Sequence, residues 1–188
     1  MAIKKDINNY TPNAEDVFFI DSNIWIYLLD INCIVESSKS NDKKVEKYST
    51  FIEKLKENNI EIVLLSMSIS EIYNIYIRNL SKRYYDLNGI QYSENRFKKI
   101  YRPSRQFNND NKFIISNIKS NILPLVKVVN DNFDDLDINK VLNTRSDYDF
   151  NDNYYMRFCE KNNYKILTND KDFINNYDDI NVEVYTII

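Results

Sequence analysis

The chain has 188 residues, of which 43% are hydrophobic and 28% charged, and its formal net charge is −3. This length and balance predict a single globular domain over residues 1–188, with enough apolar side chains for a substantial core. No apolar run approaches the roughly 20 residues that cross a bilayer, and the start of the chain lacks the apolar stretch of a secretory signal, so we expect a cytoplasmic protein without a membrane segment.

The composition excludes several kinds of catalytic site. The chain has no histidine, which rules out Ser-His-Asp triads and zinc sites built on imidazole. Its single glycine, Gly89, rules out the glycine-rich dinucleotide fingerprint and the Walker A loop. Cys33 and Cys159 are far apart and have no metal-ligand spacing, so we expect two reduced thiols. Carboxylate chemistry remains.

Predicted strands and helices alternate along the chain. Apolar runs predict strands over 17–20, 61–65, 125–129, 164–167 and 182–187. Helical spacing predicts helices over 22–30, 41–57, from Ser66 or Ser68 to about 80, 112–123, 134–143 and 150–162. The stretch 81–109 is expected to form helical pieces joined by loops. Alternating strands and helices indicate right-handed crossovers and a parallel sheet covered on both faces.

Four carboxylates are placed near the ends of these predicted strands. Asp21 directly follows strand 17–20, Asp170 comes just after strand 164–167, and Glu71 and Asp152 lie in the first turns of helices. Sites in open parallel sheets form beyond the carboxyl ends of the strands, where the strand order reverses. Convergence of these acids therefore requires strands 17–20 and 164–167 to be neighbours. Four acids on one edge repel each other unless a cation lies among them, and their hard oxygen ligands favour Mg²⁺ or Mn²⁺.

Each acid also has a simpler interpretation. Asp21 can cap the helix that starts at residue 22, and Glu71 can be an exposed helix residue. Asp152 can compensate the helix dipole in a first turn. Asp149 is the N-cap candidate of helix 150–162, with Asp152 at the spacing of a capping box. Asp172 can cap or turn the loop in which it lies. The functional interpretation depends on the four positions taken together.

Three segments resemble the motifs of PIN domains. The segment Phe18–Ile24 (FFIDSNI) is similar to the opening motif, a hydrophobic strand that ends in Asp with Ser and Asn following. Leu65–Ile72 (LSMSISEI) resembles the second motif, in which Glu follows a strand after a Ser-rich helix start. Asp152 is followed sixteen residues later by Thr168–Phe173 (TNDKDF), which resembles the joined third and fourth motifs in order and spacing.

The resemblance implies a three-layer α/β/α sandwich with a central, mostly parallel sheet and endonucleolytic cleavage of RNA. It also implies that Mg²⁺ or Mn²⁺ is bound by Asp21, Glu71, Asp152 and Asp170. Asn23 and Thr168 would position side chains or water, and Asp149 and Asp172 are supporting candidates. The largest bacterial branch of the family consists of VapC-type toxins, whose partner is an antitoxin protein. Asn153 stands where the family usually has a small apolar residue.

A basic, aromatic-rich stretch lies between the second and third motifs, and we interpret residues 78–112 as a helical insertion. It contains nine Lys and Arg residues against three acids, a local charge of +6. Candidate RNA-binding cations are Lys82, Arg83, Arg96, Lys98, Lys99, Arg102 and Arg105. The interleaved aromatic residues are Tyr84, Tyr85, Tyr92, Phe97, Tyr101 and Phe107. Cations with stacking rings favour single-stranded or looped RNA. Alternatively, the rings pack a helical hairpin or a homodimer face.

The predicted reaction is hydrolysis of RNA by water bound to one or two metal ions, which needs no histidine base. A second hypothesis is a PIN-like module that binds RNA or a protein without cutting. A third is a phosphoryl-transfer enzyme with Asp21 as nucleophile. That chemistry typically places a second Asp two residues later, where this chain has Asn23, so the third hypothesis is disfavoured.

Overall fold

The computed structural model describes residues 2–30, 39–144, 149–175 and 179–187. Within these ranges the strands form a six-stranded sheet in which every neighbouring pair is parallel, in the order β1-β6-β5-β2-β3-β4. The strands are β1 (Ile3–Asp6), β2 (Val17–Ile20), β3 (Glu61–Leu64), β4 (Lys127–Val128), β5 (Lys165–Leu167) and β6 (Glu183–Thr186). The expected α/β class with a central parallel sheet is confirmed.

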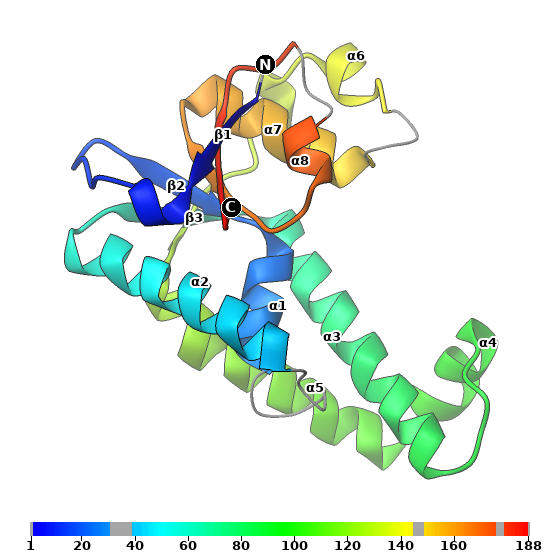
Figure 1. Cartoon of the computed structure of the whole chain (residues 1–188). Helices are drawn as coiled ribbons and strands as arrows, with labels where there is room; N and C mark the ends of the chain where they lie inside the picture. Colours follow the sequence, from blue (N-terminus) through cyan, green and yellow to red (C-terminus); the bar gives the residue numbers. More distant parts are fainter. Residues whose placement is uncertain (1, 31–38, 145–148, 176–178, 188) are drawn as a thin grey trace.

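Helices cover both faces of the sheet (Figure 1). On one face lie α1 (Ser22–Asp30), α2 (Lys39–Glu57), α3 (Ser66–Leu87) and α5 (Arg105–Asn117). On the other lie α6 (Ile138–Val141), α7 (Phe150–Asn162) and α8 (Asp172–Asn175). Short 3-10 turns span Ile7–Asn9, Leu123–Leu125 and Phe133–Asp135. The far ends of α3 and α5 extend beyond the sheet, where α4 (Glu94–Arg96) and the π-helix Phe97–Tyr101 join them; a second π-helix, Ile118–Ile122, continues α5.

The hydrophobic core has two parts, one on each face of the sheet, because successive side chains of a strand point to opposite faces. In β2, Phe18 and Ile20 pack with α1 and α2 residues, whereas Phe19 packs with α7 residues, and all three are fully buried. In β3, Ile62 and Val63 divide in the same way. Continuous apolar runs are therefore required, because both faces of these strands are covered.

Several element boundaries differ from the sequence prediction. Helix α3 continues to Leu87 and ends before Gly89, whose φ of +64° suits a residue without a side chain. Neither of the two predicted serines caps α3. Instead Asp131, from the loop after β4, accepts a hydrogen bond from the Ser66 backbone N–H at 3.1 Å. This cap comes from 65 residues away and could not be found by local pattern.

Other differences affect the edges of the sheet and the middle of the chain. Strand β1 was not predicted; it has an exposed pattern and pairs with β6 at one edge. Helix α5 begins at Arg105, seven residues before the predicted start, with Ser104 as its N-cap. The helix predicted over 134–143 is reduced to a 3-10 turn and the four residues of α6. Short or amphipathic elements carry weaker apolar signals than buried strands.

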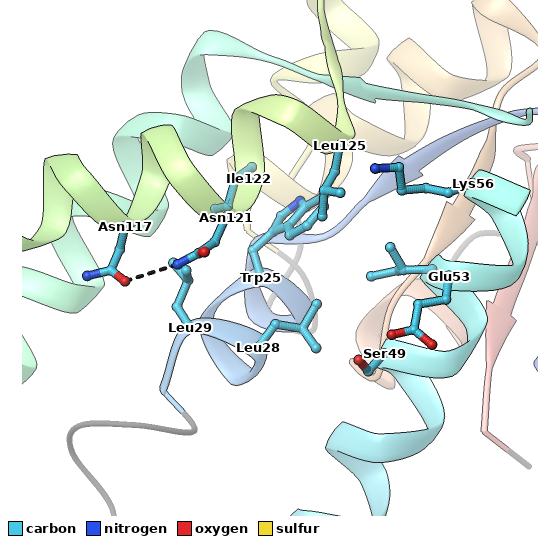
Figure 2. Close-up of a pocket in the computed structure, with 11 residues that line it drawn as sticks. Trp25, Leu28, Leu29, Ser49, Glu53, Lys56, Asn117, Asn121, Ile122 and Leu125 are labelled. Carbon is cyan, nitrogen blue, oxygen red and sulfur yellow. Dashed lines mark hydrogen bonds between the residues drawn. The ribbon is translucent and has the colours of Figure 1, made fainter.

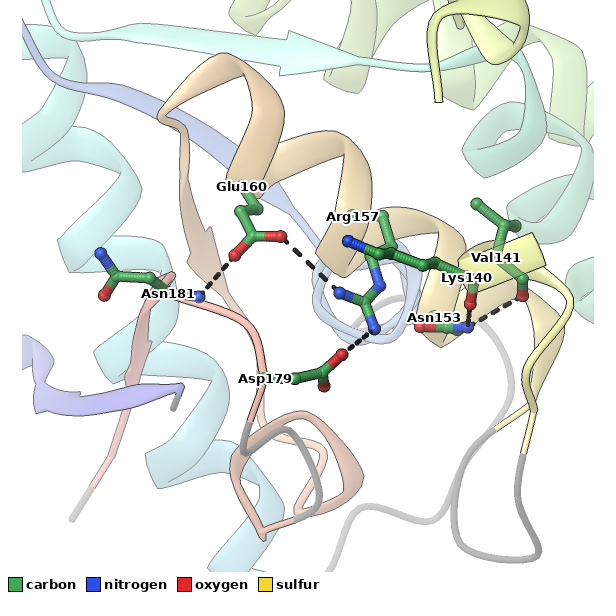
Figure 3. Close-up of polar contacts among 7 residues, drawn as sticks. All are labelled: Lys140, Val141, Asn153, Arg157, Glu160, Asp179 and Asn181. Carbon is green, nitrogen blue, oxygen red and sulfur yellow. Dashed lines mark hydrogen bonds and ion pairs between the residues drawn. The ribbon is translucent and has the colours of Figure 1, made fainter. Parts of the chain in front are cut away.

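Side-chain contacts tie α7 to α6 and to the segment before β6 (Figure 3). Asn153 donates from its amide to the carbonyl oxygens of Lys140 and Val141, both at 2.8 Å, at the end of α6. One turn later, the buried Arg157 donates to Asp179 at 2.6 Å in the segment before β6. Asparagine at position 153 therefore anchors α6 to α7, a role that a small apolar residue cannot perform.

Two expectations from composition concern the cysteines and the membrane. Cys159 is a buried free thiol in α7, whose pKa burial raises well above the usual range, and Cys33 lies outside the described residues. Among the helices that the structure describes, none combines the length and the apolar character that a bilayer crossing requires.

Candidate functional site

The site begins where the strand order reverses, between β2 and β5. Ile20 pairs with Leu167 across these two strands, so Asp21 and Thr168 follow directly at their carboxyl ends. The Asp21 backbone N–H donates to the Leu167 carbonyl at 3.0 Å, and the Thr168 hydroxyl donates to Asp21 Oδ2 at 2.7 Å. The prediction that these strands are neighbours at the switch point is confirmed.

Asp21 is a buried carboxylate with acidic neighbours; its side chain is 4% exposed. Its pKa is raised to about 6, chiefly by burial and also by the negative charges of Glu71 and Asp170, while the Thr168 hydrogen bond opposes the shift. The Asn23 backbone N–H and side-chain amide also lie at 3.4 Å from its two oxygens, so Asp21 caps α1 weakly. Asp21 therefore both caps α1 and belongs to a group of interacting acids.

Glu71 is held by two hydroxyl groups from other helices. Ser22 on α1 donates to Glu71 Oε2 at 2.7 Å, and Tyr155 on α7 donates to the same oxygen at 3.0 Å. Among the described residues, the other oxygen, Oε1, accepts a hydrogen bond only from the Asn151 amide, at 3.5 Å. Burial, and then the Glu71 charge, raise the pKa of Tyr155 far above its ordinary value, so its hydroxyl stays a donor. Glu71 is thus not an exposed helix residue.

Asp152 belongs to a capping box at the start of α7. The Asp149 side chain accepts hydrogen bonds from the backbone N–H groups of Asn151 and Asp152, at 2.8 and 3.1 Å. In return Asp152 accepts from the Asp149 N–H at 3.4 Å. Burial, then repulsion from Asp149 and, more weakly, from Asp21 and Asp170, together raise the pKa of Asp152 to about 7. Asp149 is a cap, whereas Asp152 also interacts with the acids of the sheet edge.

Asp170 is positioned by the turn after β5. Its backbone N–H donates to the Thr168 hydroxyl oxygen at 2.9 Å, and its Oδ1 accepts from the Asp172 N–H at 3.0 Å. Asp170, rather than Asp172, therefore holds the start of α8, and Asp172 is its exposed first residue. Thr168 is fully buried and connects Asp21 to Asp170, as a positioning residue would.

We call Asp21, Glu71, Asp152 and Asp170 the acidic edge. Their charges interact, and their ligand atoms are all oxygens, the type that Mg²⁺ and Mn²⁺ prefer. Nevertheless, within the described ranges no three acidic or cysteine side chains are grouped so that they would hold a metal ion. The donor chemistry of the acidic edge fits such an ion, whereas the side chains are more widely spread than a coordination sphere.

Sequence reasoning missed the two hydroxyl partners of Glu71. Ser22 lies within the first motif but was not assigned a role, and Tyr155 follows the candidate ligand Asp152 by three residues, on the same side of α7. A tyrosine at this spacing from a candidate ligand is a signal that could have been used. Its contact with Glu71 spans 84 residues and joins two helices, α3 and α7, that cover opposite faces of the sheet.

The basic stretch forms a helical arm, which consists of the outer ends of α3 and α5 with α4 and the π-helix Phe97–Tyr101 between them. All seven candidate cations are exposed. In contrast, the rings of Tyr85, Phe97 and Tyr101 are buried, and Tyr101 contacts the other two with ring centroids 6.4 and 5.6 Å apart. The expectation that these three rings stack on RNA bases is wrong, because they form the core of the helical arm. The packing alternative accounts for them.

A cavity of about 350 Å³ lies away from the acidic edge, between α1, α2 and the second π-helix (Figure 2). Trp25 and Ile122 line it with apolar groups, and Glu53 and Lys56 of α2 line it with charged groups. Within the described ranges, the Trp25 Nε1 is buried and has no hydrogen-bond partner. The carboxylates of the acidic edge do not line this cavity.

The capping role of Asp149 leads to a prediction about stability. We expect Asp149→Ala to lower the free energy of unfolding by about 1 kcal/mol, because two backbone N–H groups lose their acceptor. Asp149→Asn should keep most of the cap and lower the pKa of Asp152, because one repelling charge is removed. Urea denaturation measures the first effect, and NMR titration of the Asp152 carboxyl measures the second. An unchanged unfolding midpoint in the alanine variant would contradict the capping role.

Comparison with known proteins adds no assignment: neither family models nor curated sequences match this chain.

Proposed function

We propose that the chain is a metal-dependent endoribonuclease that hydrolyses RNA phosphodiesters at the acidic edge. One observation carries the proposal. The buried Asp21 lies at the switch point of the sheet, and the charged groups that act most strongly on it, Glu71 and Asp170, are themselves acidic. Burying a carboxylate among like charges costs free energy, which a bound cation would offset. Switch points are also where α/β proteins bind ligands.

Each residue of the acidic edge would have a role in binding the metal or in positioning another ligand. Asp21, Asp152, Asp170 and Glu71 would supply carboxylate oxygens to Mg²⁺ or Mn²⁺, which would activate water and neutralise charge on the phosphate. Thr168 holds Asp21 Oδ2, and the two hydroxyls on Glu71 Oε2 leave its Oε1 for a ligand. In the metal-free protein the pKa of Asp152 is about 7, so metal binding near neutral pH would displace a proton from this carboxyl.

The resemblance to PIN domains supports the same proposal through the order and spacing of the four acids. If the resemblance extends to VapC-type toxins, an antitoxin protein is the expected partner and the cytoplasm the expected location. Both belong to the proposal, as does RNA as substrate. The exposed cations of the helical arm are compatible with a polyanionic substrate, because they carry the positive charge that the acidic edge lacks.

A second candidate function is a module that binds RNA or a protein without cutting. It is favoured by the spread of the carboxylates, since no three of the described acidic side chains are grouped as metal ligands. This candidate predicts RNA or protein binding that is indifferent to divalent metal. It also predicts that the acids of the edge can be neutralised without loss of binding.

A cleavage assay separates the two candidates. Mixed RNA is incubated with the full chain and Mn²⁺ or Mg²⁺, with EDTA in parallel, and fragments are resolved on a denaturing gel. We expect cleavage with metal and none with EDTA, and Asp152→Asn should lose most of it. Asp134→Asn is the matched control, because Asp134 is exposed and lies outside the acidic edge. Cleavage that persists in EDTA, or in Asp152→Asn at the wild-type rate, would reject the nuclease mechanism, and binding without cleavage would favour the module.

A further inference from the structure

Cations from separate parts of the helical arm meet around one aromatic ring. Arg78 on α3 and Arg102, after the first π-helix, place their guanidinium carbons 5.7 and 5.5 Å from the ring centroid of Phe97. These arginines are 24 residues apart in sequence. Because the ring is buried and both side chains are exposed, the guanidinium groups rest on it and remain open to solvent.

Two lysines complete this group around a single acid. Arg78 forms an ion pair with Glu94, and Tyr92 donates to the same carboxylate at 2.7 Å. The pKa of Glu94 is lowered by the Tyr92 hydrogen bond and then by the charges of Arg78 and Lys98. Lys98 therefore also interacts electrostatically with the Glu94 carboxylate. Lys82 Nζ lies 5.9 Å from the Tyr92 ring centroid. Four cations against one acid leave a local excess of three positive charges.

We call Arg78, Lys82, Lys98 and Arg102 the basic cradle. Its two residues on α3, Arg78 and Lys82, lie on the same side of that helix as Glu71 of the acidic edge. Arg78 follows Glu71 by seven residues, which corresponds to about 10 Å along the helix and about 20° around it. Lys82 lies about 16 Å along the helix, again within about 20° of that side. The exposed side chains between them on this side, such as Asn74, are uncharged.

We propose that the basic cradle binds backbone phosphates of single-stranded RNA whose scissile phosphate lies at the acidic edge. The inference rests on the proposed function and adds the path of the substrate, along α3 from the sheet toward α4 (Figure 1). A polyanion fits the excess of positive charge, and no acid on α3 interrupts the path between Glu71 and Lys82. A single strand fits because the phosphate must approach the buried Asp21.

Charge reversal at the cradle tests the path. Binding of a fluorescently labelled single-stranded RNA to the full chain is measured by anisotropy in EDTA, so that cleavage does not interfere, over a series of salt concentrations. We expect the double variant Lys82→Glu/Lys98→Glu to raise Kd at least tenfold. The slope of log Kd against log salt should fall by about 1.4, from two lost phosphate contacts of about 0.7 each. Both side chains are exposed, and circular dichroism checks that the variant is folded.

The matched control is Lys43→Glu/Lys44→Glu on α2, which makes the same change in net charge at exposed positions outside the cradle. We expect its Kd to stay within about twofold of the wild type. Equal weakening by both double variants would overturn the cradle, because binding would then depend on net charge alone. RNA bound through the cradle but not cut with any metal would reject the nuclease and leave the cradle standing. If the wild type cleaves RNA with metal but the cradle variant binds RNA as tightly as the control variant, the cradle is rejected and the nuclease stands.

Discussion

Replacing Asp21 by asparagine is expected to abolish metal-dependent RNA cleavage and to stabilise the metal-free protein at pH 8. The activity should fall on the order of a thousandfold, since a ligand worth several kcal/mol of transition-state stabilisation is lost. Asparagine keeps the shape of the side chain and an oxygen for the Thr168 hydroxyl, so the turn after β2 should be retained. A mutation that removes activity and adds stability is typical of a strained functional group.

The expected stabilisation follows from the raised pKa of Asp21. Its pKa is about 6 in the folded protein, against an ordinary value of 3.8 that applies in the unfolded chain. Between these values the folded state binds a proton that the unfolded state has released, so stability falls as the pH rises from about 4 to about 6. The loss above pH 6 is about 3 kcal/mol, and asparagine, which does not ionise, should recover much of it.

Urea denaturation of the two proteins at pH 8 and near pH 4 measures this difference. We expect a clear gain for Asp21→Asn at pH 8 and a much smaller difference near pH 4, where Asp21 is protonated in the folded state and only partly ionised in the unfolded chain. The matched control is Asp16→Asn at the start of β2, a buried aspartate that pairs with Lys165 at 3.0 Å and accepts from Tyr10 at 2.8 Å. That variant should lose stability. Destabilisation of Asp21→Asn at pH 8 would contradict the account of Asp21.

The second large effect is stabilisation by Mn²⁺ that depends on pH. At a free concentration one hundred times the Kd, a metal that binds only the folded state adds about 2.7 kcal/mol to the free energy of unfolding. Protons compete with metal for carboxylates, and Asp21 and Asp152 have pKa values of about 6 and about 7. We therefore expect the apparent Kd for Mn²⁺ to be at least tenfold weaker at pH 5 than at pH 8.

Thermal unfolding with and without Mn²⁺ at both pH values, together with calorimetric titration, measures this linkage. Asp152→Asn should remove most of the metal-induced shift, whereas the exposed Asp134→Asn should keep it. A melting shift of equal size at pH 5 and pH 8, or one that survives in Asp152→Asn, would indicate that the ion binds away from the acidic edge. No shift with any divalent metal would favour the binding module.

Local patterns were sufficient for the elements that are buried on both faces or capped from within. Strand β2 and helices α1 and α7 have the predicted bounds, because continuous apolar runs and the Asp149 cap act over a few residues. Local sequence patterns were insufficient where the partner of an element lies far along the chain. Asp131 caps α3 across 65 residues, and β1 is recognisable as a strand only through its pairing with β6.

In the candidate site, too, some residues could be identified from the sequence and others could not. Its four acids were identified from the sequence, because each follows or lies near the end of an apolar run and their order resembles a known set of motifs. The hydroxyls of Ser22 and Tyr155 on Glu71 were not, since they meet it from two other helices. The rings of the helical arm were misassigned for a related reason: aromatic residues between cations have the same sequence pattern whether they face solvent or pack inside.

The sequence by itself determined the chemistry available to this protein: carboxylates without histidine, on strands apolar enough to require cover on both faces. The tertiary structure alone decided which of these groups interact. It placed β2 beside β5, so that Asp21 and Thr168 share a hydrogen bond across 147 residues. It also brought together the basic cradle from α3, the π-helix Phe97–Tyr101 and the residue that follows it. Strand order and helix packing bring distant residues together, and the free energy that drives them comes from the buried core rather than from the polar groups that they position.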